Sequence, residues 1–375
     1  MRPLRLTREI QGHLREELLI RRGDIAAALC LAACLASAGC SRRALPEPPE
    51  EYPGSYAEGA ILRLSGGSLV PLEPAAPGNA PKEGVPAGVA PVVAAAAAAA
   101  DGRSAFLALN RIGLAVLRID PERRRYRIDS MDTGDQFAGR SVGGLFLQNG
   151  ILYCLLYRDP LFETQAPRDP PSVLLAADLE NPVPAARPFD LGLKPEVGGL
   201  FALFPRPDGF WALQLRREVP EGFESSFLSY DPSSGAVRGL PRGEFEKMLA
   251  PRLLSSAPES LRRAARTLAP EGFPVLVSAS LANGSRTAYS FGDGAPEDTV
   301  ELRGAVTDSG TALVAWNAVA AVAREKAETS FRLPLPMPGA VYRDAVPLAG
   351  AILAIWELGV FPNVEESGVV LLPAP

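Results

Sequence analysis

One hydrophobic pattern recurs along the C-terminal three quarters of the chain. Each copy has a turn that ends in glycine, a short apolar run, and a charged or polar stop. Short apolar runs bounded by turn residues are typical of β-strands. The copies begin at Gly102, Gly150, Gly209, Gly272, Gly310 and Gly350. The pattern therefore predicts an all-β chain built from similar units.

The spacing of these copies favours a β-propeller. A repeat of about 40–60 residues with several short strands is typical of propeller blades, since one blade cannot bury both of its faces alone. We predict a propeller domain over residues 60–375 with six blades, and seven as the alternative. The hairpin predicted over residues 60–72 precedes the first blade, and residues 337–375 lack a final strand. The N-terminal hairpin is therefore predicted to complete the last blade.

A repeated five-residue sequence, VGGLF, supports the same interpretation. It occupies Val142–Phe146 and again Val197–Phe201, 55 residues later. We place both copies in the first strands of adjacent blades. There, glycine lets neighbouring backbones approach closely.

Two segments depart from the strand pattern. Seven consecutive alanines, Ala94–Ala100, favour a helix by propensity, but their position before a predicted strand favours a first strand. Both interpretations stay open. Residues 244–268 have helical spacing of apolar positions and predict a helical insertion that is interrupted near Pro251 and Pro258.

The N-terminus has the order of a secretory signal. Arg21 and Arg22 precede an apolar run over 25–39, which is shorter than the ~20 residues of a membrane span. Small residues then precede Cys40. This arrangement resembles a bacterial lipoprotein signal, which implies removal of residues 1–39 and lipidation of Cys40. Cys34 is the alternative lipidation site, because Leu31 stands three residues before it, although its apolar run is shorter.

The resemblance also implies a location. The mature protein would be held by its lipid on a membrane of the bacterial cell envelope, facing the periplasm or the surface. Residues 40–59 contain several prolines and acidic residues and predict a flexible tether between the lipid and the folded domain.

Composition narrows the functions. The net charge is −5, and removal of residues 1–39 takes away six arginines and four acidic residues, which leaves −5 − 2 = −7. A negative chain is a poor nonspecific binder of nucleic acid. The single histidine, His13, lies in the predicted signal, and Cys154 is the remaining thiol. We therefore predict no catalytic residues, no metal site and no cofactor.

Two motifs have more than one interpretation. Gly139–Gly143 matches G-x-S-x-G, but a nucleophile elbow needs a strand-turn-helix and a histidine base, so we interpret it as a turn into a strand. Asp129, Asp132 and Asp135 recur at spacing three. This spacing differs from that of a Ca²⁺ loop, which favours a solvated turn over a cation site.

The candidate binding residues are the polar or charged residues that directly follow the predicted second strands. Equivalent positions of successive blades lie around one rim, so these stops would line one mouth of the ring. Solvated strand ends are the alternative interpretation. The residues of this candidate rim are Asn110, Arg111, Arg158, Asp159, Arg216 and Arg217.

Together these features favour a lipid-anchored envelope protein with a binding or scaffold role and no catalysis. Its partners would be the membrane, through the lipid, and an envelope protein or glycan, but not nucleic acid. The alternative is a periplasmic carbohydrate-active propeller enzyme that uses paired carboxylates, which needs no histidine.

Overall fold

The structure is a computed structural model, and the chain divides into two units, residues 1–51 and 52–375. The predicted signal, Cys34 and Cys40 lie outside the described residues. Within the described residues, the helices are too short or too polar to cross a bilayer. The described ranges are 51–72, 92–158, 172–193, 199–269, 273–282, 285–291, 299–316, 318–325, 327–359 and 364–374.

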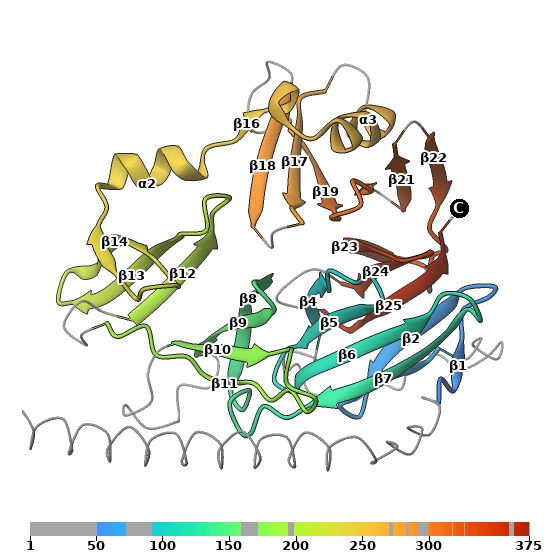
Figure 1. Ribbon diagram of the computed structural model, residues 1–375, viewed down its shortest axis with the longest axis horizontal. Helices are drawn as coiled ribbons and strands as arrows, with labels where there is room; N and C mark the ends of the chain where they lie inside the picture. The colour runs from blue at the N-terminus through green and yellow to red at the C-terminus, as the bar shows by residue number, and fades with distance from the viewer. Residues whose placement is uncertain are drawn as a thin grey trace, which may run out of the picture. The chain divides into compact units, whose positions relative to one another are not determined.

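Residues 52–375 are nearly all β, as predicted, and the described strands form five sheets (Figure 1). The first sheet has the order β1 (Gly54–Ser55), β7 (Arg125–Met131), β6 (Gly113–Asp120), β5 (Ser104–Leu109), β4 (Val93–Ala98). The second has β11 (Arg187–Pro188), β10 (Ser172–Asp178), β9 (Ile151–Arg158), β8 (Arg140–Gln148). The third has β12 (Gly199–Pro205), β13 (Trp211–Val219), β14 (Gly222–Tyr230), β15 (Val237–Gly239).

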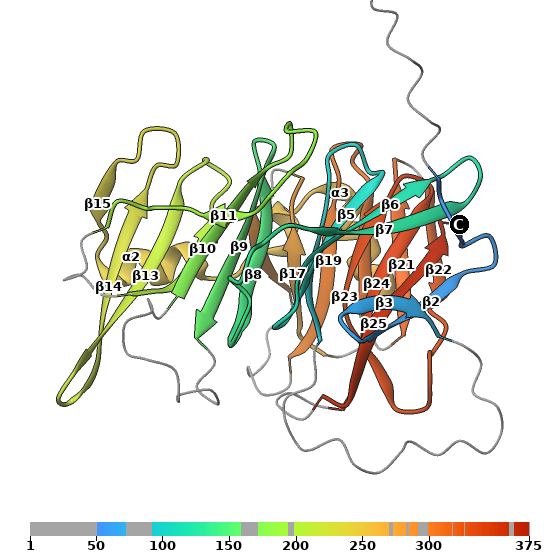
Figure 2. The same ribbon diagram turned by 90° about the horizontal axis from the view of Figure 1, so that it is seen from below.

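The fourth and fifth sheets follow in the chain. The fourth has the order β16 (Arg252–Leu253), β18 (Arg286–Phe291), β17 (Val275–Ser280), β19 (Val300–Val306), β20 (Ala312–Trp316), β21 (Val319–Arg324), β22 (Ala327–Arg332). The fifth has β23 (Ala340–Leu348), β24 (Ala351–Leu358), β25 (Glu366–Pro373), β2 (Ala60–Ser65), β3 (Ser68–Pro71). Figure 2 shows the strands of successive sheets along their length.

The predicted repeat corresponds to real strands. Five of the six apolar runs are second strands, namely β5, β9, β13, β20 and β24, and each pairs antiparallel with the strand before it. The run predicted after Gly272 is β17, which is instead the first strand of its hairpin. In these five cases, the apolar run is therefore the second strand of an antiparallel hairpin.

The sheet count differs from the six predicted units. The β17–β18 hairpin does not stand alone, because β17 pairs in parallel with β19, from Val275↔Val300 to Ser280↔Ala305. Two first strands thus satisfy each other's backbone groups, which removes two open edges. The result is one seven-stranded sheet in place of two smaller ones.

The N-terminal hairpin completes the last sheet, as predicted. β2 pairs antiparallel with β25, from Ala60↔Leu371 to Arg63↔Gly368. The buried Trp356 indole donates a hydrogen bond of 3.2 Å to the carbonyl of Leu62. The folded part begins earlier than the predicted tether end at residue 59, because β1 pairs with β7 and Tyr56 is fully buried.

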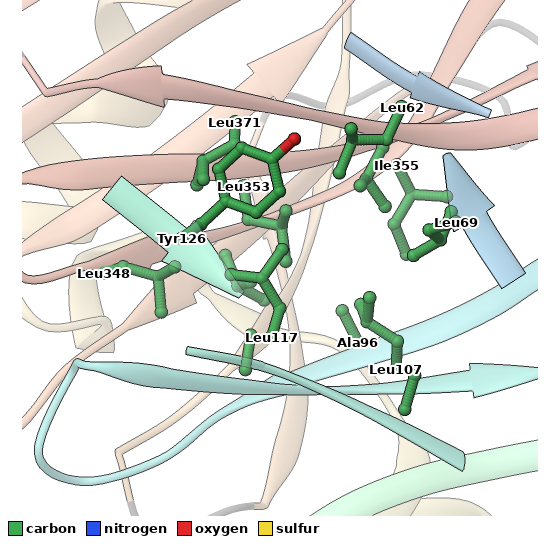
Figure 3. Close-up of a cluster of buried hydrophobic side chains, with 14 of the residues drawn as sticks. Leu62, Leu69, Ala96, Leu107, Leu117, Tyr126, Leu348, Leu353, Ile355 and Leu371 are labelled. Carbon is green, nitrogen blue, oxygen red and sulfur yellow. The ribbon is translucent and has the colours of Figure 1, made fainter. Parts of the chain in front are cut away.

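The largest core lies between the first and fifth sheets (Figure 3). Leu107 and Leu117 come from the first sheet, and Leu62, Leu353 and Leu371 come from the fifth. Alternate residues of each strand point to this side, which buries one face of both sheets. Because β2 supplies Leu62, the N-terminal strand helps to close this core.

The alanine run forms a strand and not a helix. Val93–Ala98 is β4, which pairs with β5 and contacts β8 and β23 of two neighbouring sheets. Tertiary pairing overrides the helix propensity of alanine here. Small side chains suit a strand on which three sheets converge.

The helical insertion over 244–268 is confirmed. It contains α2 (Arg242–Leu249), the 3-10 turn Leu254–Ser256 and α3 (Glu259–Leu268), and Pro258 stands at the N-cap of α3. One face of α3 is buried against the fourth sheet, through Leu261, Ala264, Ala265 and Leu268.

The two VGGLF copies lie in first strands but not in the same register. The β8–β9 ladder skips Gly143, the second letter of its copy, whereas the β12–β13 ladder skips Phe201, the fifth letter of the other. Val197 and Gly198 lie outside the described residues. At Gly143 a Cβ would come within 2.1 Å of the Tyr157 ring, so a close approach does require glycine there.

Side chains link neighbouring sheets at these skipped positions. Asn110 of the first sheet accepts a hydrogen bond of 2.7 Å from the N–H of Val142, just before the bulge in β8. Ser367 of the fifth sheet accepts one of 3.1 Å from the N–H of Val93, just before the bulge in β4. A bulge leaves a strand N–H without a ladder partner. The neighbouring sheet supplies the acceptor.

We predict that Gly368→Ala strongly destabilises the fold. A Cβ at Gly368 would lie 1.9 Å from the carbonyl oxygen of Leu62, so β2 and β25 would have to separate. The expected loss is about 3 kcal/mol of unfolding free energy, measured by urea denaturation. Gly144→Ala is the control, because a Cβ at Gly144 would meet no heavy atom within 4 Å. Equal stability of the two variants would contradict this account of the β2–β25 pair.

The hydrogen bond from Val142 to Asn110 should also contribute to stability. Asn110→Ala leaves the Val142 N–H without its acceptor in a site where Asn110 is only 5% exposed. The expected loss is about 1–3 kcal/mol in urea denaturation. Asn110→Asp keeps the acceptor oxygen and should lose less. An Asn110→Ala protein as stable as the wild type would exclude this link.

Candidate functional site

The structure places the predicted rim residues in different settings. Asn110 is buried and caps Val142, and Arg111 follows it with a φ of 63°. Arg158 ends β9, but its side chain and all of Asp159 lie outside the described residues. Arg216 and Arg217 lie within β13 and not after it, because β13 extends to Val219.

The bulges reveal a positional equivalence among the second strands. In four sheets, the residue just before the bulge of the first strand pairs with a residue of the second strand. The next residue along the chain after that partner occupies an equivalent position in each sheet. These equivalent residues are Asn110 after β5, Tyr157 in β9, Arg216 in β13 and Glu357 in β24. The equivalent of Arg216 in the second sheet is therefore Tyr157, one residue before the predicted Arg158. These positions lie beside the N-terminal ends of the first strands, and two of them, Asn110 and Arg216, are residues of the predicted rim.

Three of the side chains at this end form a stack across two sheets. The rings of Tyr157 and Phe201 are stacked with centroids 6.1 Å apart, and the Arg216 guanidinium lies 3.4 Å from the Phe201 centroid. Phe201 is the bulged residue of β12 and is 37% exposed. Burial raises the pKa of the Tyr157 hydroxyl, and the Arg216 charge opposes this rise.

Arg216 also lines a groove on the third sheet. Gln214 and Arg216 point to the same face of β13, opposite Phe227 and Ser225 of β14. The alternate residues Leu213 and Leu215 are fully buried on the other face. The groove has a volume of about 400 Å³ and is lined by Gln214, Arg216, Phe223, Ser225, Phe227, Arg242, Phe245 and Glu246.

Helix α2 closes one end of this groove. Phe245 of α2 packs on Phe227 and Phe204, with ring centroids 4.5 Å and 6.0 Å away. This contact fixes the helix on the sheet, since the buried Ala212 and Leu240 join the same cluster. The other end is open, where Phe223 is 70% exposed.

The charges in the groove are unequally paired. Arg242 and Glu246 form an ion pair of 2.7 Å along α2. Within the described part of the chain, Arg216 stacks on the Phe201 ring and forms neither an ion pair nor a hydrogen bond. The adjacent Arg217 points to the opposite face and pairs with Glu224 at 2.5 Å. Among these residues, the groove therefore presents one guanidinium that is held in place by stacking and lacks a counterion.

A second, smaller cavity of about 70 Å³ lies at the other end of the first strands. Its walls are mostly alanine, leucine and valine from β4, β8, β19 and β23. Arg286 on its border is bound to Asp344 at 2.8 Å and to Ser280 at 3.2 Å, so its charge is compensated. Asp308 is the carboxylate among the described lining residues.

The other motifs have structural roles. Residues 140–148 form the strand β8, so Gly139–Gly143 is not the strand-turn-helix of a nucleophile elbow. Burial raises the pKa of the Cys154 thiol, which keeps it protonated and unreactive. Asp129 pairs with Arg118 and Arg127. Within the described residues, the acidic, cysteine and histidine side chains form no metal-binding group.

Sequence reasoning missed the aromatic part of the groove. Phe223 and Gln214 stand in no motif, and the VGGLF repeat that contains Phe201 was interpreted through its glycines. The importance of these residues depends on the register of β12, β13 and β14. One signal was present: in β13 the apolar Leu213 and Leu215 alternate with the polar Gln214 and Arg216, where a fully enclosed strand would be apolar throughout.

Comparison with solved structures gives only remote similarity. The isopeptidase AtxE2 has a TM-score of 0.32 at 10% identity, with 74% of this chain and 49% of that chain covered, so this chain spans about half of its length. An endo-arabinase from Bacteroides thetaiotaomicron has a TM-score of 0.31 at 13% identity, covering 76% and 93%. A glycosyl hydrolase from Bacteroides ovatus has a TM-score of 0.24 at 10% identity, covering 69% and 90%.

No curated protein matches the sequence. A family model does match it, over residues 73–373, which include the second, third and fourth sheets in full and all residues of the groove. The chain therefore belongs to DUF8086, a family of unknown function.

Proposed function

We propose that this protein is a lipid-anchored, non-catalytic binding protein of the bacterial envelope, built as a propeller, that holds an envelope glycan in the groove beside α2. The observation that carries the proposal is Arg216. Its guanidinium is stacked on Phe201 at the edge of a 400 Å³ groove and has no counterion among the described residues. Clefts of this size with a few fixed polar groups are typical ligand sites.

The sheet order supports the propeller. Neighbouring sheets meet through their first strands, as β4 does with β8 and β23, and β23 does with β19. Each sheet then meanders outward from its first strand. With β17 counted beside β19, the described residues include six first strands, which agrees with six blades of which two are fused.

The lack of a carboxylate pair in either described cavity favours binding over catalysis. A glycosidase holds two carboxyl groups about 5–10 Å apart across its substrate. Among the described lining residues, the small cavity supplies Asp308 and the groove supplies Glu246, which is bound to Arg242. Each cavity thus offers one carboxylate and not two.

The lipid anchor is tested by Cys40→Ala. The variant should move from the membrane fraction to the soluble fraction and lose its incorporation of labelled fatty acid, because the thiol is the acylation site. Cys34→Ala is the matched control and should stay in the membrane fraction. A Cys40→Ala protein that is still labelled and membrane-bound would move the anchor to Cys34 or overturn the lipoprotein assignment.

Glycan binding is tested by co-sedimentation of the full protein, in detergent micelles, with purified peptidoglycan sacculi and with immobilised envelope carbohydrate. We expect Arg216→Ala to lose about tenfold in affinity, because its charged hydrogen bonds to the ligand disappear. Arg217→Ala is the matched control, since it lies next in the strand, points to the other face and should bind as the wild type does. The proposal fails if the wild type is retained on neither material, or if both variants bind equally.

A further inference from the structure

We infer that the glycan held in this groove is an acidic saccharide, whose carboxylate binds Arg216 while a sugar ring lies against Phe223. This inference rests on the proposed function and adds the chemical class of the ligand. The groove combines three kinds of surface that together favour such a ligand: an arginine edge, an open aromatic face and a row of neutral polar groups.

The orientation of Arg216 favours a carboxylate. One planar face of the guanidinium lies against the Phe201 ring, with Cζ 3.4 Å from the ring centroid. The N–H groups of a guanidinium lie in its plane, so this stack leaves the edge available to donate. A planar carboxylate accepts two such bonds side by side, which makes it the matching partner. The Tyr157 ring also stacks on Phe201, which helps to hold the Phe201 ring in place and reduces the ordering cost of binding.

The charge balance of the groove favours one acidic group. The described lining contains two arginines and one glutamate, and the glutamate is already paired with Arg242. A single positive charge is therefore left at Arg216. Although the whole chain carries a net charge of −5, the groove attracts one carboxylate and not a neutral ligand.

The backbone beneath the groove argues against a peptide bound as an added strand. Strand addition needs an unpaired sheet edge. The groove floor is made by β13 and β14, and these are the two inner strands of the third sheet, each with partners on both sides. Side chains alone therefore recognise the ligand, which suits a molecule with many hydroxyl groups.

The open end of the groove suits a sugar ring. Phe223 is 70% exposed, and its position on β14 places it two residues from Ser225 on the same face. An aromatic face carries partial negative charge and attracts the C–H groups of a sugar ring. Gln214 and Ser225, 3.4 Å apart, supply the donors and acceptors that sugar hydroxyls need.

The test compares two forms of one polysaccharide. Affinity electrophoresis or calorimetry of the full protein is run with polygalacturonate and with its fully methyl-esterified form, which keeps the sugar and removes the charge. We expect the acid form to bind about tenfold more tightly. Arg216→Gln should abolish this difference by weakening binding of the acid form alone. Phe223→Ala should weaken both forms equally.

Phe210→Ala is the control for Phe223→Ala, because Phe210 is 39% exposed in the loop before β13, outside the groove lining, and should leave both affinities unchanged. Dextran sulfate tests for simple ion exchange. If it binds as tightly as polygalacturonate, or if the ester binds as well as the acid, the inference is wrong. Retention on sacculi with no polygalacturonate binding would overturn this inference and leave the proposed function standing, whereas failure on sacculi and on immobilised envelope carbohydrate would overturn the function itself.

Discussion

Much of the structure depends on a single extra residue in the first strand of four of the five described sheets. In β4, β8, β12 and β23 the ladder to the second strand skips Ala94, Gly143, Phe201 and Arg343 respectively. In β8 and β4 the residue before the skip, Val142 or Val93, donates its backbone N–H to a side chain outside its own sheet. For β8 and β4 the acceptor is a side chain of a neighbouring sheet, Asn110 or Ser367. A local irregularity thus becomes the bond between sheets.

The same irregularity creates the candidate site. A bulge turns its residue out of the regular alternation, and in β12 this residue is Phe201. Its ring is reached from one sheet by Tyr157 and from its own sheet by Arg216. Where the bulged residue is Arg343, the equivalent side chain is Glu357, and the two form an ion pair of 3.4 Å. The same kind of bulge therefore carries an ion pair in the fifth sheet and, in the third sheet, an arginine with no counterion among the described residues.

Much of the fold was predictable from the sequence, because turn glycines and apolar runs report local structure directly. The second strands, the helical insertion and the role of the N-terminal hairpin all followed from patterns of this kind. The parallel pairing of β17 with β19 did not, since it joins two first strands that each look like the start of a separate unit. The alanine run shows the same limit: propensity favoured a helix, but pairing with β5 and packing against two neighbouring sheets make it a strand.

The candidate site was less predictable. Arg216 was identified because charged residues follow an apolar run, but Arg217 was identified for the same reason and faces the other way. Only the register of β13 separates them. Phe201 belongs to the second copy of VGGLF, and the bulge falls three residues later in this copy than in the first. The repeat therefore drew attention to its glycines and not to the aromatic ring of Phe201.

The pairing of β2 with β25 also sets an order of events during synthesis. A chain that leaves the ribosome or a membrane pore with its N-terminus first presents residues 60–65 long before residues 366–373 exist outside. Leu62 and Leu69 then remain without their partners in the largest core until nearly the whole chain has emerged. A chain truncated before β25 would lack the partner strand of β2 and leave part of this core unfilled, and exposed apolar surface of this kind is what chaperones and proteases recognise.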